Sequence, residues 1–229
     1  MTEKKTIALV HATFNAVNPM TDYMRRHASE YRIVNYLDGF LMDKIRKEGK
    51  ISDSSVGRML HMLSTACQDG ADGIIMTCTI FSGHEPYFSR IFSAPIICPD
   101  GAMHDTVAKM GGKTAIICTF EGTVETTRNQ YYEYCRKNVM PQQVDMYTVP
   151  EAFEAIQSGD TEKCNDLVRK KVYELDEGYD QIILAQISMA GAADGLETKH
   201  AKVFTSPSSA LAQIKHLMGV GLDHDHDRK

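Results

Sequence analysis

The stretch Asp69-Gly70-Ala71-Asp72-Gly73-Ile74-Ile75-Met76-Thr77-Cys78 decides the fold, because the chain repeats its pattern 108 residues later. The second copy reads Glu177-Gly178-Tyr179-Asp180-Gln181-Ile182-Ile183-Leu184-Ala185-Gln186. In each copy a turn signal leads into a short apolar run, which is the pattern of a buried strand. We therefore predict two equivalent strands that end at Cys78 and Gln186.

The same offset recurs in other parts of the chain. Lys5-Thr6-Ile7-Ala8-Leu9-Val10 lies over Lys113-Thr114-Ala115-Ile116-Ile117-Cys118. Further matches pair Pro99 with Pro207 and Ala102 with Ala210. Three segments that share one offset indicate two copies of a four-stranded unit, related by a pseudo-two-fold axis.

Apolar runs alternate with segments of helical period along the whole chain, which predicts the α/β class with parallel strands. The expected strands are 6–12, 31–36, 73–79, 94–98, 113–119, 144–149, 180–186 and 201–205. The expected helices are 17–28, 53–69, 101–110, 123–138, 150–157, 161–177, 189–195 and 208–218.

These elements predict two pseudo-symmetric parallel-sheet lobes with flanking helices. The first lobe is 1–98 with 208–222, the second is 99–207, and 223–229 is a mobile tail. Ligands of open parallel sheets bind beyond the carboxyl ends of the strands. We therefore expect a cleft between the lobes, with Cys78 and Gln186 approaching a ligand from opposite faces.

The composition excludes several classes of protein. The 229 residues are 43% apolar and 24% charged with a net charge of −5, which suits a globular chain with a proper core. No basic run is present, so we expect no nucleic-acid partner. No signal-peptide pattern or membrane-spanning stretch is seen, so we expect a cytoplasmic protein with a small-molecule partner and no membrane partner.

The cysteines and the carboxyl-terminal residues suggest no metal site and no disulfide scaffold. Six cysteines lie singly, at positions 67, 78, 98, 118, 135 and 164. None forms the pairs that zinc sites or disulfide frameworks use. The tail Asp223-His224-Asp225-His226-Asp227 has metal-binding residue types, but a solvated end is the favoured interpretation.

Four segments in this order resemble the aspartate/glutamate/hydantoin racemase superfamily, which includes relatives such as arylmalonate decarboxylase and maleate isomerase. They are Ala12-Thr13-Phe14-Asn15-Ala16-Val17-Asn18-Pro19, Gly73-Ile74-Ile75-Met76-Thr77-Cys78-Thr79, Thr119-Phe120-Glu121-Gly122-Thr123-Val124 and Ile183-Leu184-Ala185-Gln186-Ile187-Ser188-Met189-Ala190-Gly191. The resemblance implies proton transfer next to a carboxylate or carbonyl group, without cofactor or metal, in a homo-oligomer.

The family uses two cysteines on opposite faces of the substrate, and this chain matches only one of them. Cys78 stands at the first position and is the candidate acid/base or nucleophile, at a turn where helix amides favour thiolate. The second motif reads Ala-Cys-(Thr/Ala)-x-Met in the family, whereas Gln186 stands here in place of the cysteine. A glutamine side chain cannot act as acid or base at neutral pH.

The resemblance also implies a set of groups that bind the substrate. Its members are Thr13 and Asn15 in the loop after the first strand, Thr79, Thr119, Thr123, Gln186, and the backbone N–H groups of Ile187 and Ser188. Each Thr is alternatively a cap, and Gln186 is alternatively a satisfied buried amide. His11 and His84 rank below Cys78 as proton carriers, and Asp72 and Asp180 are expected to have structural roles.

Three functions remain open from the sequence. The first is a racemase or isomerase of a small amino acid, hydroxy acid or hydantoin-like compound. The second is a single-cysteine decarboxylase or lyase acting on a malonate-like acid. The third is a carboxylate-binding protein without turnover.

Overall fold

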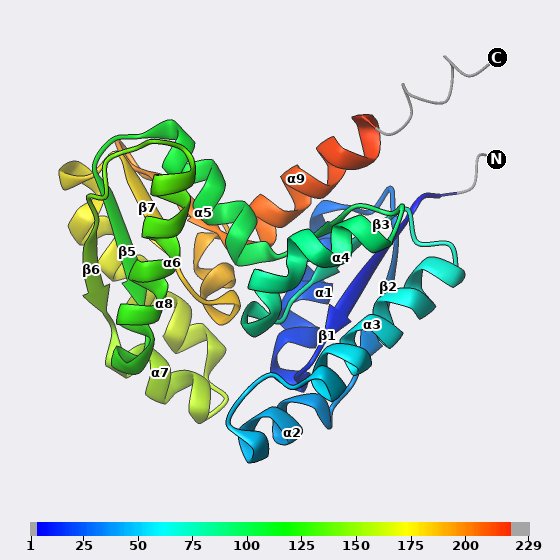
Figure 1. Cartoon of the computed structure of the whole chain (residues 1–229). Helices are drawn as coiled ribbons and strands as arrows, with labels where there is room; N and C mark the ends of the chain where they lie inside the picture. Colours follow the sequence, from blue (N-terminus) through cyan, green and yellow to red (C-terminus); the bar gives the residue numbers. More distant parts are fainter. Residues whose placement is uncertain (1–3, 221–229) are drawn as a thin grey trace. The chain divides into compact units, whose positions relative to one another are not determined.

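The computed structural model describes residues 4–220, without the side chains of Asn15 and Val220. These residues form two compact units (Figure 1). Unit 1 runs to Pro99 and resumes at Ala210, and unit 2 is Asp100–Ser209. The division expected from the sequence put the crossings after residues 98 and 207. The proposed tail, including the segment 223–227, lies outside the described residues.

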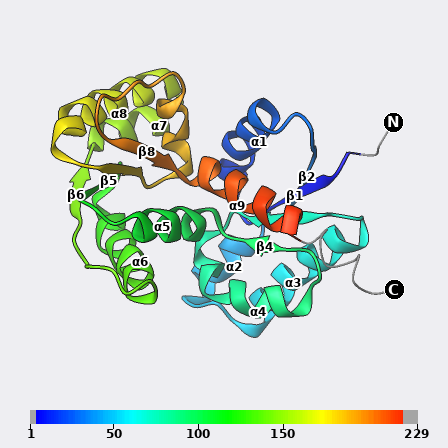
Figure 2. The same ribbon diagram turned by 90° about the horizontal axis from the view of Figure 1, so that it is seen from above.

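Unit 1 is a parallel sheet with the strand order β2-β1-β3-β4. Its strands are β1 (Thr6–His11), β2 (Arg32–Leu37), β3 (Gly73–Met76) and β4 (Ile96–Ile97). Its helices are α1 (Val17–His27), α2 (Leu41–Glu48), α3 (Asp53–Gln68) and α4 (Glu85–Ile91), with the 3-10 segments η1 (Phe14–Ala16) and η2 (Thr79–His84). Most of α9 (Ser206–Val220) completes it. In Figure 2, α1 and α9 lie on one side of these strands and α2, α3 and α4 on the other.

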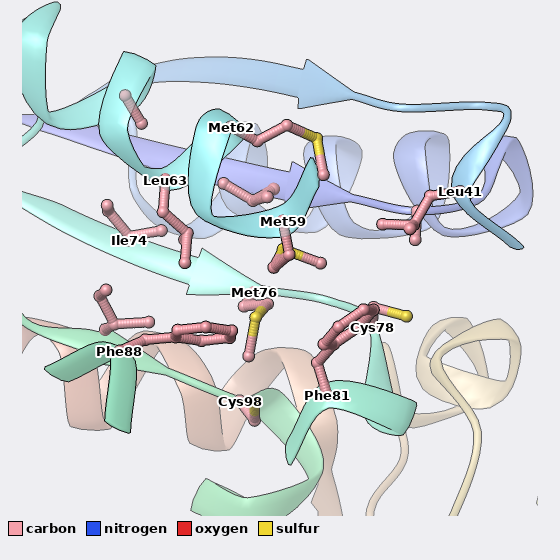
Figure 3. Packing of buried hydrophobic residues seen from close by; sticks show 14 of the residues in the cluster. Leu41, Met59, Met62, Leu63, Ile74, Met76, Cys78, Phe81, Phe88 and Cys98 are labelled. Carbon is pink, nitrogen blue, oxygen red and sulfur yellow. The ribbon is translucent and has the colours of Figure 1, made fainter. Parts of the chain in front are cut away.

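The core of unit 1 covers both faces of its central strands. Ile74 and Met76 pack with Met59 and Leu63 of α3 on one face (Figure 3). On the other face, a Cβ atom at Gly73 would lie only 2.9 Å from side-chain atoms of α9. Glycine is therefore required at this position so that α9 can approach the strand.

Unit 2 is a second parallel sheet with the equivalent order β6-β5-β7-β8. Its strands are β5 (Thr114–Cys118), β6 (Asp145–Thr148), β7 (Gln181–Leu184) and β8 (Lys202–Thr205). Its helices are α5 (Pro99–Met110), α6 (Val124–Lys137), α7 (Pro150–Gln157) and α8 (Thr161–Leu175), with the 3-10 segments η3 (Glu121–Thr123), η4 (Asp176–Gly178) and η5 (Ile187–Ala193).

The core of unit 2 is built in the same way. Ile182 packs with buried residues of α7 and α8, and its neighbour Ile183 packs with residues of α5 and α6. Successive residues of a strand point to opposite faces, so both faces of the sheet are buried. All four residues of β7 are buried, as is typical of a central strand in a doubly covered parallel sheet.

The predicted repeat holds at the third strands but is one residue out of register at the first strands. Asp72 Oδ2 accepts a hydrogen bond from the backbone N–H of Thr6, and Asp180 Oδ2 accepts one from Lys113, both at 2.7 Å. Thr6 therefore corresponds to Lys113, at an offset of 107, and the expected superposition of Thr6 on Thr114 is wrong. A shift by one residue exchanges the two faces of a strand, so the shared Lys-Thr pair misleads. The two aspartates are structural, as expected.

The eight predicted strands are all present; seven are shorter than expected, and β2 is shifted by one residue. The predicted helix 189–195 is wrong, because residues 189–193 belong to the 3-10 segment η5 and residues 194 and 195 form a turn. Helices α2 and α4 were not predicted. They have eight and seven residues, and such short segments give only a weak helical period. Helix α7, also of eight residues, was predicted.

Candidate active site

Cys78 follows β3 at the carboxyl edge of the unit 1 sheet. Its backbone is extended and it immediately precedes η2. The residue is only 9% exposed and belongs to the same apolar cluster as Phe81. Its Sγ atom lies 3.9 Å from Sδ of Met42, and in Figure 3 it points away from Met76 and Cys98. Cys78 thus belongs to the core cluster, at the end of it that lies toward Met42.

The other predicted residues of unit 1 lie on two connections at the same edge. Thr13 precedes η1 in extended conformation, and its hydroxyl makes no capping hydrogen bond. Thr79 opens η2 next to Cys78 and is half-buried. Asn15 lies within η1, and its side chain is outside the described part of the chain. The alternative role of Thr13 as a cap is therefore wrong.

His11 joins the ends of three strands beneath this edge. Its Nδ1 atom lies 2.8 Å from Oγ1 of Thr77 and its Nε2 atom lies 2.9 Å from Oδ1 of Asn35. Thr21 Oγ1 donates to the same Asn35 oxygen at 2.8 Å. The imidazole is fully buried, and burial lowers the pKa of His11 although the Asn35 hydrogen bond raises it. His11 is therefore a neutral cross-link at neutral pH.

Gln186 occupies in unit 2 the place that Cys78 has in unit 1, immediately before η5. Its Oε1 atom accepts a hydrogen bond from the backbone N–H of Thr119 at 3.1 Å. Its Nε2 atom donates to Oγ1 of Thr123 at 3.1 Å, and that hydroxyl donates to the carbonyl of Phe120 at 2.7 Å. A backbone N–H can only donate, so these contacts fix which end of the amide is oxygen. The carboxamide bridges β7 to the loop after β5.

Solved structures resemble this chain, whereas no family model and no curated protein sequence matches it. Allantoin racemase from Klebsiella pneumoniae is similar with a TM-score of 0.69 and 17% identity, over 95% of this chain and 89% of that protein. Aspartate racemase from Picrophilus torridus has a TM-score of 0.63 and 15% identity, over 94% of each chain. Glutamate racemase from Bacillus anthracis has a TM-score of 0.64 and 14% identity, over 96% of this chain and 84% of that protein. The fold is that of the aspartate/glutamate racemase superfamily.

Within this racemase fold, the substrate-binding residues predicted for unit 2 form one hydrogen-bonded group. Thr119 and Thr123 are joined through Gln186, as described above. Ile187 and Ser188 follow as the first residues of η5, where N–H groups have no acceptor within a 3-10 segment. The amide of Gln186 is therefore hydrogen-bonded at both ends, as the structural alternative expected, but the residue is half-buried and not buried.

Arg169 of α8 holds the far end of η5, a role that was not predicted. Its Nε atom donates to the carbonyl of Ala192 at 3.1 Å, and its Nη2 atom donates to the carbonyls of Gly191 at 3.2 Å and Asp194 at 3.1 Å. A cation at the end of a helical segment also stabilises its dipole. Nothing in the local sequence indicates this contact, because α8 and η5 are brought together only by the fold.

The remaining cysteines of the racemase fold are poorer candidates than Cys78. Burial raises the pKa of Cys118, while hydrogen bonds with Thr123 and Thr127 lower it. Burial also raises the pKa of Cys67, Cys135 and Cys164. Cys98 lies in the unit 1 core. A raised pKa keeps a thiol protonated and unreactive at neutral pH.

Unit 1 also has a hollow of about 700 Å³ between the end of β2 and α3. Its lining includes Phe40, Arg58 and His61, but none of the predicted site residues. Among residues 4–220, no three His, Cys, Asp or Glu side chains are placed to hold a metal ion. Within the same range, no helix is both long and apolar enough to cross a membrane.

Proposed function

We propose that this chain is a cofactor-independent enzyme of the racemase superfamily, which moves a proton at a carbon next to a carboxylate or carbonyl group of a small acid. Cys78 is the acid/base in this proposal. The observation that carries it is the position of Cys78, which lies at the carboxyl edge of the sheet, where ligands of parallel sheets bind. Its sulfur points away from Met76 and Cys98 in Figure 3.

The proposed reaction begins with the thiolate of Cys78 removing a proton from the substrate carbon. The electron pair moves onto the neighbouring carbonyl or carboxylate oxygen, so donors must stand where this charge develops. We assign that role to Thr79 and to the N–H groups of Ile187 and Ser188, with Thr13 and Asn15 binding the rest of the substrate. Returning a proton from Cys78 to the same face regenerates the thiolate and the starting enantiomer, so inversion needs a proton from a second donor on the opposite face.

The bridge in unit 2 restricts what its threonines can do in this scheme. The N–H group of Thr119 and the hydroxyl hydrogen of Thr123 are already engaged, with Gln186 and Phe120 respectively. These two groups therefore hold the loop in place. The side-chain hydroxyl of Thr119 and the backbone N–H groups of η5 would bind the substrate anion. We propose that Gln186 itself acts on the substrate only as a neutral neighbour.

One observation favours a second candidate, a single-cysteine decarboxylase. Gln186 cannot ionise, and both ends of its amide are held by hydrogen bonds. A decarboxylase of a malonate-like acid needs only one proton, which Cys78 would deliver to the carbon after carbon dioxide leaves. Classical two-base racemisation needs a second proton carrier on the opposite face.

The experiment follows solvent deuterium into the substrate carbon by proton NMR, with amino acids, 5-substituted hydantoins and malonates, and measures carbon dioxide in parallel. Exchange without gas release supports the racemase or isomerase, and gas release supports the decarboxylase. A compound that raises the unfolding midpoint while none is exchanged or decarboxylated would instead identify a binding protein. The matched control is Cys67→Ala, which removes a half-buried thiol near the carboxyl end of α3, on the connection that leads into β3.

A further inference from the structure

The amino edge of the unit 2 sheet has a hollow of about 370 Å³ that the proposed chemistry does not use. It is lined by Lys113, Thr114, Tyr132 and the segment 142–145. Lys113 directly precedes β5, and Asp145 is the first residue of β6. Gln186 and the loop after β5 follow the opposite ends of the strands of this sheet. The hollow is therefore a separate candidate for a binding site within unit 2.

Two opposite charges line this hollow without forming an ion pair. They are the ammonium group of Lys113 and the carboxylate of Asp145. The ion pairs of unit 2 join other residues, and neither of these two takes part in one among residues 4–220. Opposite charges on neighbouring strands attract each other, so their separation requires a structural cause.

Tyr179 supplies this cause, because it holds both groups. Its Oη atom donates to Oδ2 of Asp145 at 2.7 Å and lies 2.5 Å from Oη of Tyr147. Nζ of Lys113 lies 4.4 Å from the centroid of the Tyr179 ring, where an ammonium group is attracted by the aromatic face. Tyr179 itself is buried. One fixed side chain thus keeps the ammonium group at its ring and the carboxylate at its hydroxyl end.

The backbone beneath the two charges is fixed as well. The N–H group of Lys113 donates to Oδ2 of Asp180 at 2.7 Å, and Asp145 stands in the ladder between β6 and β5. On the wall formed by the segment 142–145, Oε1 of Gln142 accepts from Nη1 of Arg136 at 3.2 Å. Because this contact uses the amide oxygen, the Nε2 group of Gln142 is left to donate to an anion.

A ligand that matches this arrangement must carry both charges. A free α-amino acid has an ammonium group and a carboxylate on one carbon at neutral pH, whereas a dicarboxylate or a diamine would bring a like charge to Asp145 or to Lys113. Ligand sites have volumes of about 300–1,000 Å³, so this hollow suits a small molecule. The remaining lining, which includes Tyr132 and Val144, is uncharged and favours an uncharged side chain.

We propose that this hollow binds a small α-amino acid with an uncharged side chain. Its carboxylate meets Lys113 and Gln142, and its ammonium group meets Asp145. A bound amino acid would thereby join the starts of β5 and β6. The site lies in unit 2 alone and does not depend on the proposed function.

Three matched probes test the class of ligand. L-valine carries both charges, isovalerate lacks the ammonium group, and isobutylamine lacks the carboxylate. Each is titrated into the full-length protein labelled with nitrogen-15, and the backbone amide signals are followed by NMR. We expect L-valine to shift the signals of Lys113, Val144 and Asp145, with a Kd at least about tenfold lower than that of either analogue. Equal binding of an analogue would indicate a site for a single charge and would overturn the proposal, as would the absence of these shifts with L-valine.

Substitutions then test the two charged residues. Lys113→Met and Asp145→Asn keep similar shapes, and each should raise the Kd for L-valine at least about tenfold. Lys109→Met is the matched control, because it removes another lysine of unit 2, which pairs with Asp105, and it should leave the Kd unchanged. If neither substitution at the hollow weakens binding, the assignment is wrong. Shifts confined to the surroundings of Cys78 and Gln186 would place L-valine in the candidate active site, which overturns this inference and leaves the proposed function intact.

Discussion

The residues at positions 78 and 186 occupy the same place in two units of equivalent topology, yet they do opposite things. Cys78 is an ionisable group beside Met42, within an apolar cluster. Gln186 is a non-ionising amide whose two ends are held by the loop after β5. The difference shows that one copy of the repeat has an ionisable side chain at this position, whereas the other has an amide that forms a structural bridge.

The layer beneath these two positions differs in a complementary way. In unit 1, His11 is bonded to Thr77, the residue before Cys78. In unit 2, the corresponding residues are Cys118 and Ala185, and alanine offers no hydroxyl group. Unit 1 is therefore cross-linked below its edge, and unit 2 is cross-linked at the edge itself. Each copy therefore joins its strand ends with different polar side chains. Unit 1 uses His11 and Thr77, and unit 2 uses Gln186.

The largest expected effect is the loss of turnover when the proton carrier is removed. Cys78→Ala should lower the rate of exchange or decarboxylation about a hundredfold or more, because that is the usual contribution of an acid/base group. It should also cost about 1 kcal/mol of unfolding free energy, since the side chain is mostly buried. Cys67→Ala is the control and should retain full turnover. Equal loss in both variants would show that the thiol is not specific.

Replacing the bridge by a thiol tests the other half of the comparison. Gln186→Cys should introduce exchange at the opposite face of a bound carbon acid, or raise its rate at least tenfold. The reason is that the new thiol adds an acid/base group on that face. It also frees the Thr119 N–H, whose hydrogen exchange should accelerate. The measurement is the enantiomeric composition of the product in D2O. Racemisation by wild-type protein as fast as by two-cysteine relatives would contradict the proposal that Cys78 alone transfers the proton, at one face of the substrate.

Acid should destabilise both units through buried histidines. Burial lowers the pKa of His11 in unit 1, and burial lowers the pKa of His104 in unit 2 to about 4. The unfolded chain binds these protons near pH 6.5 and the folded chain does not, so their stabilising contribution is complete above pH 6.5 and falls as the pH drops below it.

The measurement is urea unfolding at pH 7 and pH 5. We expect the wild type to lose on the order of 1 kcal/mol for each histidine between these values. His11→Gln and His104→Gln should each show a smaller pH dependence than the wild type. A pH dependence that neither substitution reduces would assign the effect to other groups.

The smallest expected effect compares two threonines at the same edge. Thr123 accepts from Gln186 and donates to Phe120, whereas Thr13 makes no capping bond. Thr123→Val should therefore cost about 1 kcal/mol of unfolding free energy, and Thr13→Val a few tenths at most. Denaturant midpoints measured side by side decide this. Equal costs would mean that the bridge contributes nothing to stability.

The sequence predicted the fold well where local pattern and burial agree. The central strands β1, β3, β5 and β7 are mostly apolar runs, which made the sheets easy to predict. All eight predicted strands are present. Helix α2 was missed, although Gly49, which follows it with a φ of 67°, is the stop signal that such helices use. Segment η5 was mistaken for an α-helix, and the contact of Arg169 with its far end joins residues that are distant in the sequence.

The candidate site was only partly predictable for the same physical reason. Cys78 could be singled out from its place after a buried strand. The bridge of Gln186 could not, because Thr119 and Thr123 precede it by more than sixty residues, and the pairing depends on register. The one-residue error in the repeat shows how sensitive that register is. Side-chain bonds between adjacent strands become visible only when the sheet is built.

Helix α9 has a consequence for the order in which the chain acquires its structure during synthesis. Unit 2 is one continuous stretch, whereas unit 1 needs Ile214 and Met218, which lie against Gly73. A ribosome therefore completes residues 100–209 while the amino-terminal sheet still lacks this cover. Domains fold as units when their residues are available, so the first hundred residues to emerge must wait for α9 before they can close over their own core.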